Sequence, residues 1–166
     1  MKSTKDLAIY GVLAALAMIL SYVEVQIPAF VAVPGMKLGL TNIVVLVALY
    51  KLGNKSALFI NVVRIIAISL LFGTATSFAF SFAGGMLSTL VMIILKRINK
   101  FSTIGVSVAG GVTHNIGQII VAVILLNTKA IAWYLPILLI SGIFSGMLIG
   151  FIGAMVCSRV NLEMSK

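Results

Sequence analysis

Long apolar runs, separated by short polar or basic stretches, make up most of the chain. The runs fall at residues 7–25, 38–52, 57–72, 78–95, 103–126 and 131–157. A helix needs about 20 mostly apolar residues to cross a bilayer, whereas the strands of a membrane barrel are shorter and alternate in polarity. The pattern therefore predicts an all-α membrane protein. We expect a bundle of six transmembrane helices in a single integral membrane domain over residues 1–166, whose second and third helices are short.

Composition excludes an ordinary soluble domain. Hydrophobic residues make up 61% and charged residues 9% of the 166 residues, whereas about 25% of the residues of soluble proteins are charged. The few polar side chains cannot cover a soluble surface, and six membrane crossings leave little chain for a soluble catalytic domain.

The basic residues predict the orientation of the helices. Twelve Lys and Arg residues stand against three acidic residues, for a formal net charge of +9. With a cytoplasmic N-terminus, nine of the twelve lie on the cytoplasmic side, namely Lys2, Lys5, Lys51, Lys55, Lys96, Arg97, Lys100, Arg159 and Lys166. Cytoplasmic loops are enriched in Lys and Arg. We therefore expect both termini in the cytoplasm, and we interpret the charge as a topology signal rather than a nucleic-acid-binding surface.

Arg64 lies near the middle of the third predicted helix, with Asn61 three residues before it on the same face. A charged side chain at that depth costs at least about 2.5 kcal/mol unless it is paired or hydrated. No acidic residue lies within the core of another predicted helix, so the partners of Arg64 are backbone carbonyls, amides or the anionic group of a ligand. Contact with a ligand and a purely structural hydrogen-bonding role both remain open.

The fifth predicted helix carries a second polar group, formed by His114, Asn115 and Gln118. His114 and Gln118 are four residues apart and share one face of the helix, and Asn115 lies on the adjoining face. Polar side chains clustered in an apolar helix rarely face lipid. We expect them to face the interior of the bundle and to line a cavity together with Asn61 and Arg64.

The first outer loop, residues 24–37, is apolar and contains two prolines, which favours a segment that folds back onto the helices as a lid. A loop that rests on the lipid headgroups is the alternative. Glu24 and Lys37 flank the loop and can pair to close it, or they are two solvated charges whose pairing contributes less than about 1 kcal/mol. Asn42 follows at the start of the second helix and completes the candidate binding residues.

Small residues predict close helix packing in two places. The last helix carries a ladder of Gly142, Gly146 and Gly150, and such ladders let helix backbones approach closely. The first helix carries a face of small residues and one methionine: Gly11, Ala14, Ala15 and Met18. Packing within the chain and docking of another membrane protein are the two interpretations. The first helix is the better docking candidate, because its small face lies toward the cytoplasmic half.

Several kinds of chemistry have no counterpart in the sequence. It contains no Walker motif for ATP hydrolysis and no Cys/His spacing typical of a metal site. Glu24 and Glu163 fall on opposite sides of the membrane, which argues against paired-carboxylate catalysis. We therefore expect neither an enzyme nor a resident metal or cofactor.

Several stretches, together with Arg64, carry a resemblance to a known family. They are Pro-Gly-Met-Lys-Leu-Gly-Leu-Thr-Asn at 34–42, Leu-Phe-Gly-Thr at 71–74, Phe-Ala-Gly-Gly at 82–85, Gly-Val-Ser at 105–107, Thr-His-Asn-Ile-Gly-Gln at 113–118 and Tyr-Leu-Pro at 134–136. Over nearly its whole length the chain resembles the small bacterial membrane family called Gx transporter or heptaprenyl diphosphate synthase component I. That family is in turn similar to the S-components of energy-coupling factor (ECF) vitamin transporters.

The resemblance implies an S-component-like six-helix fold in the bacterial cell membrane. It implies that a vitamin-like, flavin-related or isoprenoid-related substrate binds near the outer side under a gate formed by the first outer loop. An anionic group on that substrate would suit Arg64 and Lys37. It also implies that the first helix docks a membrane T-subunit, which works with a pair of ATPase subunits. The matching small residues here are Gly11 with Ala15, and Ala14 with Met18.

The family's second name implies a different role, as a membrane partner or scaffold of a prenyl diphosphate synthase or of a redox assembly that handles quinones or flavins. Prenyl diphosphate synthases bind magnesium through aspartate-rich motifs, and this chain has a single aspartate, Asp6. On this alternative the chain is a non-catalytic partner. A secondary transporter that works alone is less favoured, because such folds often contain inverted repeats and none is evident.

Overall fold

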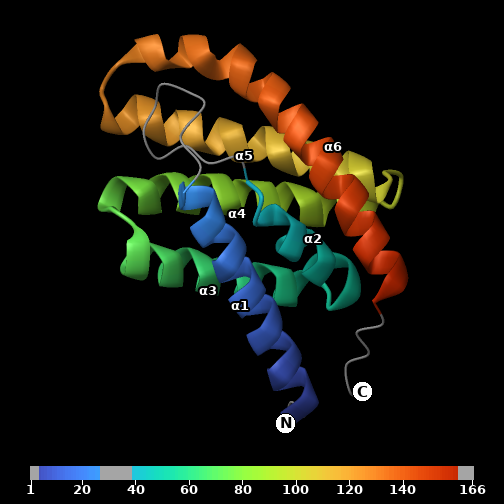
Figure 1. Ribbon diagram of the computed structural model, residues 1–166. Coiled ribbons are helices and arrows are strands. Elements are labelled where there is room, and N and C mark those ends of the chain that lie inside the picture. The colour runs from blue at the N-terminus through green and yellow to red at the C-terminus, as the bar shows by residue number, and fades with distance from the viewer. Residues whose placement is uncertain (1–3, 27–38, 161–166) are drawn as a thin grey trace.

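The structure is a computed structural model that describes residues 4–26 and 39–160, and these residues are helical with no strand (Figure 1). The elements are α1 (Thr4–Gln26), α2 (Asn42–Lys51), α3 (Asn54–Phe72), α4 (Ala75–Ile98), α5 (Thr103–Leu125), the 3-10 helix η1 (Lys129–Tyr134) and α6 (Leu135–Arg159). The all-α fold and the six helices predicted from the apolar runs are confirmed.

Five of the six α-helices are long and apolar enough to cross a membrane, so the chain is a multi-pass membrane protein. The exception is α2, whose ten residues extend about 15 Å, or half of the roughly 30 Å hydrocarbon layer. The predicted helix over 38–52 is therefore too long. The third helix, by contrast, starts at Asn54 and is longer than predicted.

The short helix α2 lies at the centre of the bundle, where it contacts all five other α-helices (Figure 1). Its side chains are apolar all round, and the six consecutive residues from Val44 to Leu49 are buried. A helix without a polar face is stable only when other elements surround it. The helices that surround α2 supply that environment, which explains why a segment too short to span the bilayer is nevertheless so apolar.

Charged side chains from two other helices bind the ends of α2. At its N-terminal end the Glu24 carboxylate accepts hydrogen bonds from the backbone N–H groups of Gly39 and Leu40, the latter at 3.1 Å. At its C-terminal end Lys96 Nζ donates to the carbonyl oxygen of Leu49 at 2.5 Å. Helix ends leave backbone groups unpaired, and a negative group at the N-terminus and a positive group at the C-terminus match the helix dipole.

Glycines let α4, α5 and α6 pack with their backbones in close approach. A Cβ atom added at Gly146 would lie 2.6 Å from the Cα of Val108 in α5, and one at Gly117 would lie 2.8 Å from the carbonyl oxygen of Ala83 in α4. A Cβ at Gly142 would likewise approach the backbone of Gly111 at 3.0 Å. The ladder on the last helix therefore serves packing within the chain.

The two ends of the bundle differ in charge. The α2–α3 and α4–α5 turns and the end of α6 lie at one end, and the α3–α4 and α5–α6 connections lie at the other (Figure 1). Six basic residues belong to the first end: Lys51, Lys55, Lys96, Arg97, Lys100 and Arg159. By the excess of Lys and Arg in cytoplasmic loops, we expect this to be the cytoplasmic end.

The glycine packing predicts opposite outcomes for two Gly→Ala changes. Gly146→Ala places a methyl group against the α5 backbone and should destabilise the protein by about 1–3 kcal/mol, the usual cost of overpacking. Gly11→Ala is the matched control, because a Cβ there meets no atom within 4 Å and alanine favours the helix. Thermal unfolding in detergent measures both, and equal melting temperatures for the two variants would contradict the packing described.

Candidate functional site

Arg64 lies inside the bundle with its guanidinium bonded to two neighbours. Nε and Nη2 donate to Asn61 Oδ1 at 3.1 and 2.8 Å, and Nη1 donates to Ser21 Oγ of α1 at 3.5 Å. Asn61 in turn donates through Nδ2 to the carbonyl oxygen of Gly85 at 2.9 Å and to Thr89 Oγ1 at 2.8 Å. The predicted proximity of Asn61 and Arg64 is confirmed, and the pair joins α3 to α1 and α4.

A chain of hydroxyl groups connects Arg64 with Glu24. Arg64 donates to Ser21, the Ser21 and Thr41 hydroxyls are 2.8 Å apart, and Thr41 donates to the Glu24 carboxylate at 3.4 Å. Each hydroxyl can accept one hydrogen bond and donate one along this path. Every group can therefore donate to the next one, from the Arg64 guanidinium to the Glu24 carboxylate. Glu24 also attracts the guanidinium electrostatically. We refer to Glu24, Ser21, Thr41, Arg64 and Asn61 as the arginine network.

The position of Glu24 corrects two expectations. It belongs to α1 rather than to a loop, and its side chain is buried rather than solvated. It also supplies the opposite charge for Arg64 that the sequence did not reveal, because the residues that connect the two lie on different helices. Lys37, the other half of the predicted loop pair, lies outside the described residues.

A second group of polar side chains, which we call the amide cluster, lies against an adjoining face of α4. It comprises Asn42, Ser81, Ser88, His114 and Gln118, all of them buried. A Cβ added at Gly84 would lie 3.0 Å from Gln118 Cγ and 3.2 Å from the His114 ring, and one at Gly39 would lie 3.8 Å from the same ring. Asn42 Nδ2 donates to Ser88 Oγ at 3.5 Å. The cluster thus joins α2, α4 and α5.

Two adjacent glycines of α4 face the two groups separately. Gly84 lies against His114 and Gln118, whereas a Cβ at Gly85 would lie 3.2 Å from Arg64 Nη2 and 3.3 Å from Asn61 Nδ2. The side chains of Asn61, Arg64, His114 and Gln118, expected to line one cavity, therefore form two neighbouring groups on adjoining faces of α4. Both groups meet at the start of α2, where Thr41 and Asn42 are adjacent.

Four buried polar atoms of the amide cluster have no hydrogen-bond partner in the described part of the chain. They are both amide atoms of Gln118 (Nε2 and Oε1), Asn42 Oδ1 and Ser81 Oγ. Gln118 is 0% exposed, so solvent does not satisfy it. An unsatisfied buried polar group costs about 1–3 kcal/mol. These atoms are the strongest structural indication of a binding position.

Asn115 lies apart from the amide cluster, contrary to the expectation that it lines a common cavity with His114 and Gln118. Its Nδ2 donates to the carbonyl oxygen of Leu138 at 2.6 Å and contacts Ser141 Oγ at 3.5 Å, so the amide joins α5 to α6. Sequence reasoning did not single out Ser21, Ser81, Ser88 and Thr89. Isolated Ser and Thr residues are common in apolar helices, and only the seven-residue spacing of Ser81 and Ser88 marks one helix face.

The small face of α1 is partly accessible. Gly11 and Ala15 are exposed, whereas Ala14 and Met18 are half-buried. Large apolar side chains surround the exposed pair on the surface, including Val12, which is 67% exposed. The described helices therefore leave Gly11 and Ala15 available for contact with lipid or with another membrane protein.

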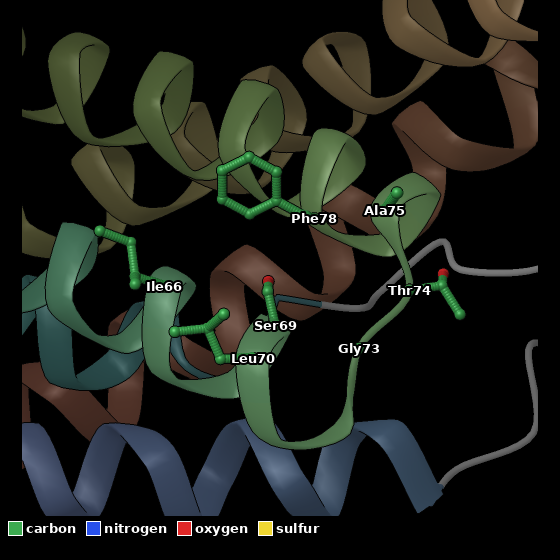
Figure 2. A pocket seen from close by; sticks show the side chains of 7 residues that line it. All are labelled: Ile66, Ser69, Leu70, Gly73, Thr74, Ala75 and Phe78. Carbon is green, nitrogen blue, oxygen red and sulfur yellow. The ribbon is translucent and has the colours of Figure 1, made fainter.

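Two hollows on the surface are apolar and lie away from both polar groups. One, of about 350 Å³, lies at the outer end of the α3–α4 hairpin, where Figure 2 shows Leu70, Ser69 and Phe78 around it. Leu70 is 81% exposed, which marks a lipid-facing surface. The other, of about 320 Å³, runs between α1, α2 and α6 and is lined by apolar side chains such as Leu16 and Val47.

Comparison with known proteins places the chain in a family. A family model described as heptaprenyl diphosphate synthase component I matches residues 13–156. The chain belongs to this family. No curated protein and no solved structure matches it. The matched region includes the arginine network and the amide cluster, and the resemblance to this family expected from the sequence motifs is confirmed.

The arginine network predicts coupling between Glu24 and Arg64. Glu24→Gln leaves a buried guanidinium without its opposite charge and should cost about 3 kcal/mol, and Arg64→Met should cost a similar amount. Because each change removes the same interaction, the double variant should lose less free energy of unfolding than the two single variants together, by at least about 1 kcal/mol. Unfolding of the wild type, both single variants and the double variant in detergent measures this difference.

Gln26→Ala is the control for this cycle, because Gln26 is exposed two residues beyond Glu24. It should change the free energy of unfolding by less than about 0.5 kcal/mol. Strictly additive effects of Glu24→Gln and Arg64→Met would show that the hydroxyl chain does not couple the two charges.

Proposed function

We propose that this chain is the substrate-binding membrane subunit, or S-component, of an ECF-type transporter in the bacterial cell membrane. It would take up a small vitamin-like, flavin-related or isoprenoid-related molecule. The observation that carries the proposal is the amide cluster, in which four buried polar atoms have no hydrogen-bond partner among the described residues. An unsatisfied buried polar group costs about 1–3 kcal/mol, and a bound molecule that pairs with these atoms would recover part of that cost.

The location of the cluster supports uptake from outside. Gln118 lies in the half of α5 that ends at the outer connection, and Asn42 lies at the outer end of α2. Glu24 binds the backbone of Gly39 and Leu40 directly before α2. On this proposal, release of that contact admits the substrate, and its restoration encloses it.

The energy for transport would come from other subunits. The chain has no Walker motif, and on this proposal it binds substrate without catalysing a reaction. A membrane T-subunit, which works with a pair of ATPase subunits, would dock on α1 at Gly11 and Ala15, the exposed small residues. A small-residue surface supports close approach of a partner helix.

The family description favours a second candidate, a membrane partner of a prenyl diphosphate synthase. Because the chain has a single aspartate, it would act as a non-catalytic scaffold for that enzyme or for a quinone or flavin redox assembly. On this candidate the polar groups stabilise the fold and bind no substrate, and the relevant partner is a soluble catalytic subunit rather than a T-subunit.

Native mass spectrometry of the protein released from its own membranes tests substrate binding. The wild type should carry a small-molecule adduct, and Asn42→Leu should reduce its occupancy at least tenfold, because the change removes one unpartnered acceptor and the Ser88 contact. Ser145→Ala is the control, since that hydroxyl bonds only to the Gly142 carbonyl within α6 in the described residues. Equal occupancy in all three proteins would count against the amide cluster as the site.

Affinity purification from digitonin-solubilised membranes separates the two candidates. A transporter subunit should recover a T-subunit and two ATPase subunits, and Ala15→Leu should abolish that recovery because its larger side chain blocks close approach. Ala132→Leu, at an exposed position on η1, should have no effect. Recovery of a prenyl synthase subunit instead, unaffected by Ala15→Leu, would favour the scaffold.

A further inference from the structure

We infer that the amide cluster binds an uncharged molecule, through an amide, lactam or hydroxyl edge that presents both a donor and an acceptor, and that it excludes diphosphates. The inference rests on the proposed function, since it specifies the ligand of the same site. It departs from the expectation that Arg64 selects an anionic substrate.

The charge of Arg64 is already balanced within the protein. Its guanidinium makes three hydrogen bonds to Asn61 and Ser21, and it is attracted by Glu24. An anionic ligand that took over Arg64 would leave the Glu24 carboxylate buried without its opposite charge. Leaving one member of a buried charge pair alone is strongly unfavourable, so the arginine network resists an anion.

The fold also separates Arg64 from the unpartnered atoms. Gly85 faces Arg64, and the preceding residue Gly84 faces His114 and Gln118. Consecutive residues of a helix point in directions about 100° apart, so Arg64 and Gln118 lie against adjoining faces of α4. A ligand bound to Gln118 therefore meets a different face of α4 from the only Arg or Lys buried among the described residues.

The unpartnered atoms themselves specify a neutral partner. Gln118 offers one amide donor and one acceptor, Asn42 offers an acceptor, and Ser81 offers a hydroxyl. The His114 ring lies beside them, against Gly84. A buried diphosphate would need paired cations, which these groups do not supply, whereas an amide or lactam edge pairs with a Gln side chain through two hydrogen bonds.

A comparison of two amide-to-leucine changes tests whether the Gln118 amide binds a ligand or stabilises the fold. In the purified, ligand-free protein Gln118→Leu should raise the melting temperature by about 2–4 °C, since it removes unsatisfied polar atoms. Asn61→Leu is the matched comparison and should lower it, because all of the Asn61 hydrogen bonds are satisfied. If Gln118→Leu also lowers the melting temperature, the amide has a structural role and the inference is overturned.

The class of ligand is tested by passing a cell metabolite extract over the protein immobilised in nanodiscs and identifying the compounds that it retains. The wild type should retain compounds that are uncharged at pH 7, and Gln118→Leu should lose at least 90% of that retention. Retention of phosphate- or carboxylate-bearing compounds that is lost in Arg64→Gln would overturn the inference and leave the proposed function intact. Retention of no compound by the wild type would overturn the proposed function, and the inference with it.

Titration with inorganic pyrophosphate gives a defined anionic probe. Calorimetry on the wild-type protein in nanodiscs should show no saturable binding up to millimolar concentration. Saturable binding that disappears in Gln118→Leu would place an anion in the amide cluster and would contradict the assignment.

Discussion

The burial of α2 is the constraint on which the rest of the structure depends. A ten-residue helix inside an apolar bundle leaves backbone N–H and C=O groups unpaired at its two ends, and unpaired backbone groups are costly inside a membrane. Glu24 from α1 binds one end and Lys96 from α4 binds the other. These two contacts fix where α1 and α4 lie around α2. They also place Glu24 beside the hydroxyl groups that lead to Arg64.

The pair Gly84-Gly85 explains how one helix serves two polar groups. Each glycine removes a side chain that would collide with a neighbour, Gln118 and His114 on one side and Arg64 on the other. The charged group is then balanced internally, and the neutral group retains unpartnered atoms. The two groups thus lie against adjoining faces of the same helix.

Much of this arrangement was predictable from the sequence, and the exceptions have physical causes. Apolar run lengths predicted the helices, and the three-residue spacing predicted the contact of Asn61 with Arg64. The second helix was expected to be short, but its length of only ten residues was not predictable, because a buried core helix and a spanning helix are both apolar all round. The role of Glu24 was missed because it depends on contacts between α1, α2 and α3. The separation of Arg64 from His114 depends on which faces of α4 meet its neighbours, and a single sequence does not reveal these.

The shortness of α2 also constrains how the protein is made. About 15 Å of apolar helix is too short to be retained by itself as a spanning segment during synthesis. Only Leu52 and Gly53 separate α2 from α3, and Gly53 has the positive φ of 97° that allows a sharp turn. We therefore expect the two helices to enter the bilayer together as one hairpin. The contact between Lys96 and Leu49 can form only after α4 has been synthesised, so α2 gains it later than its contact with α3.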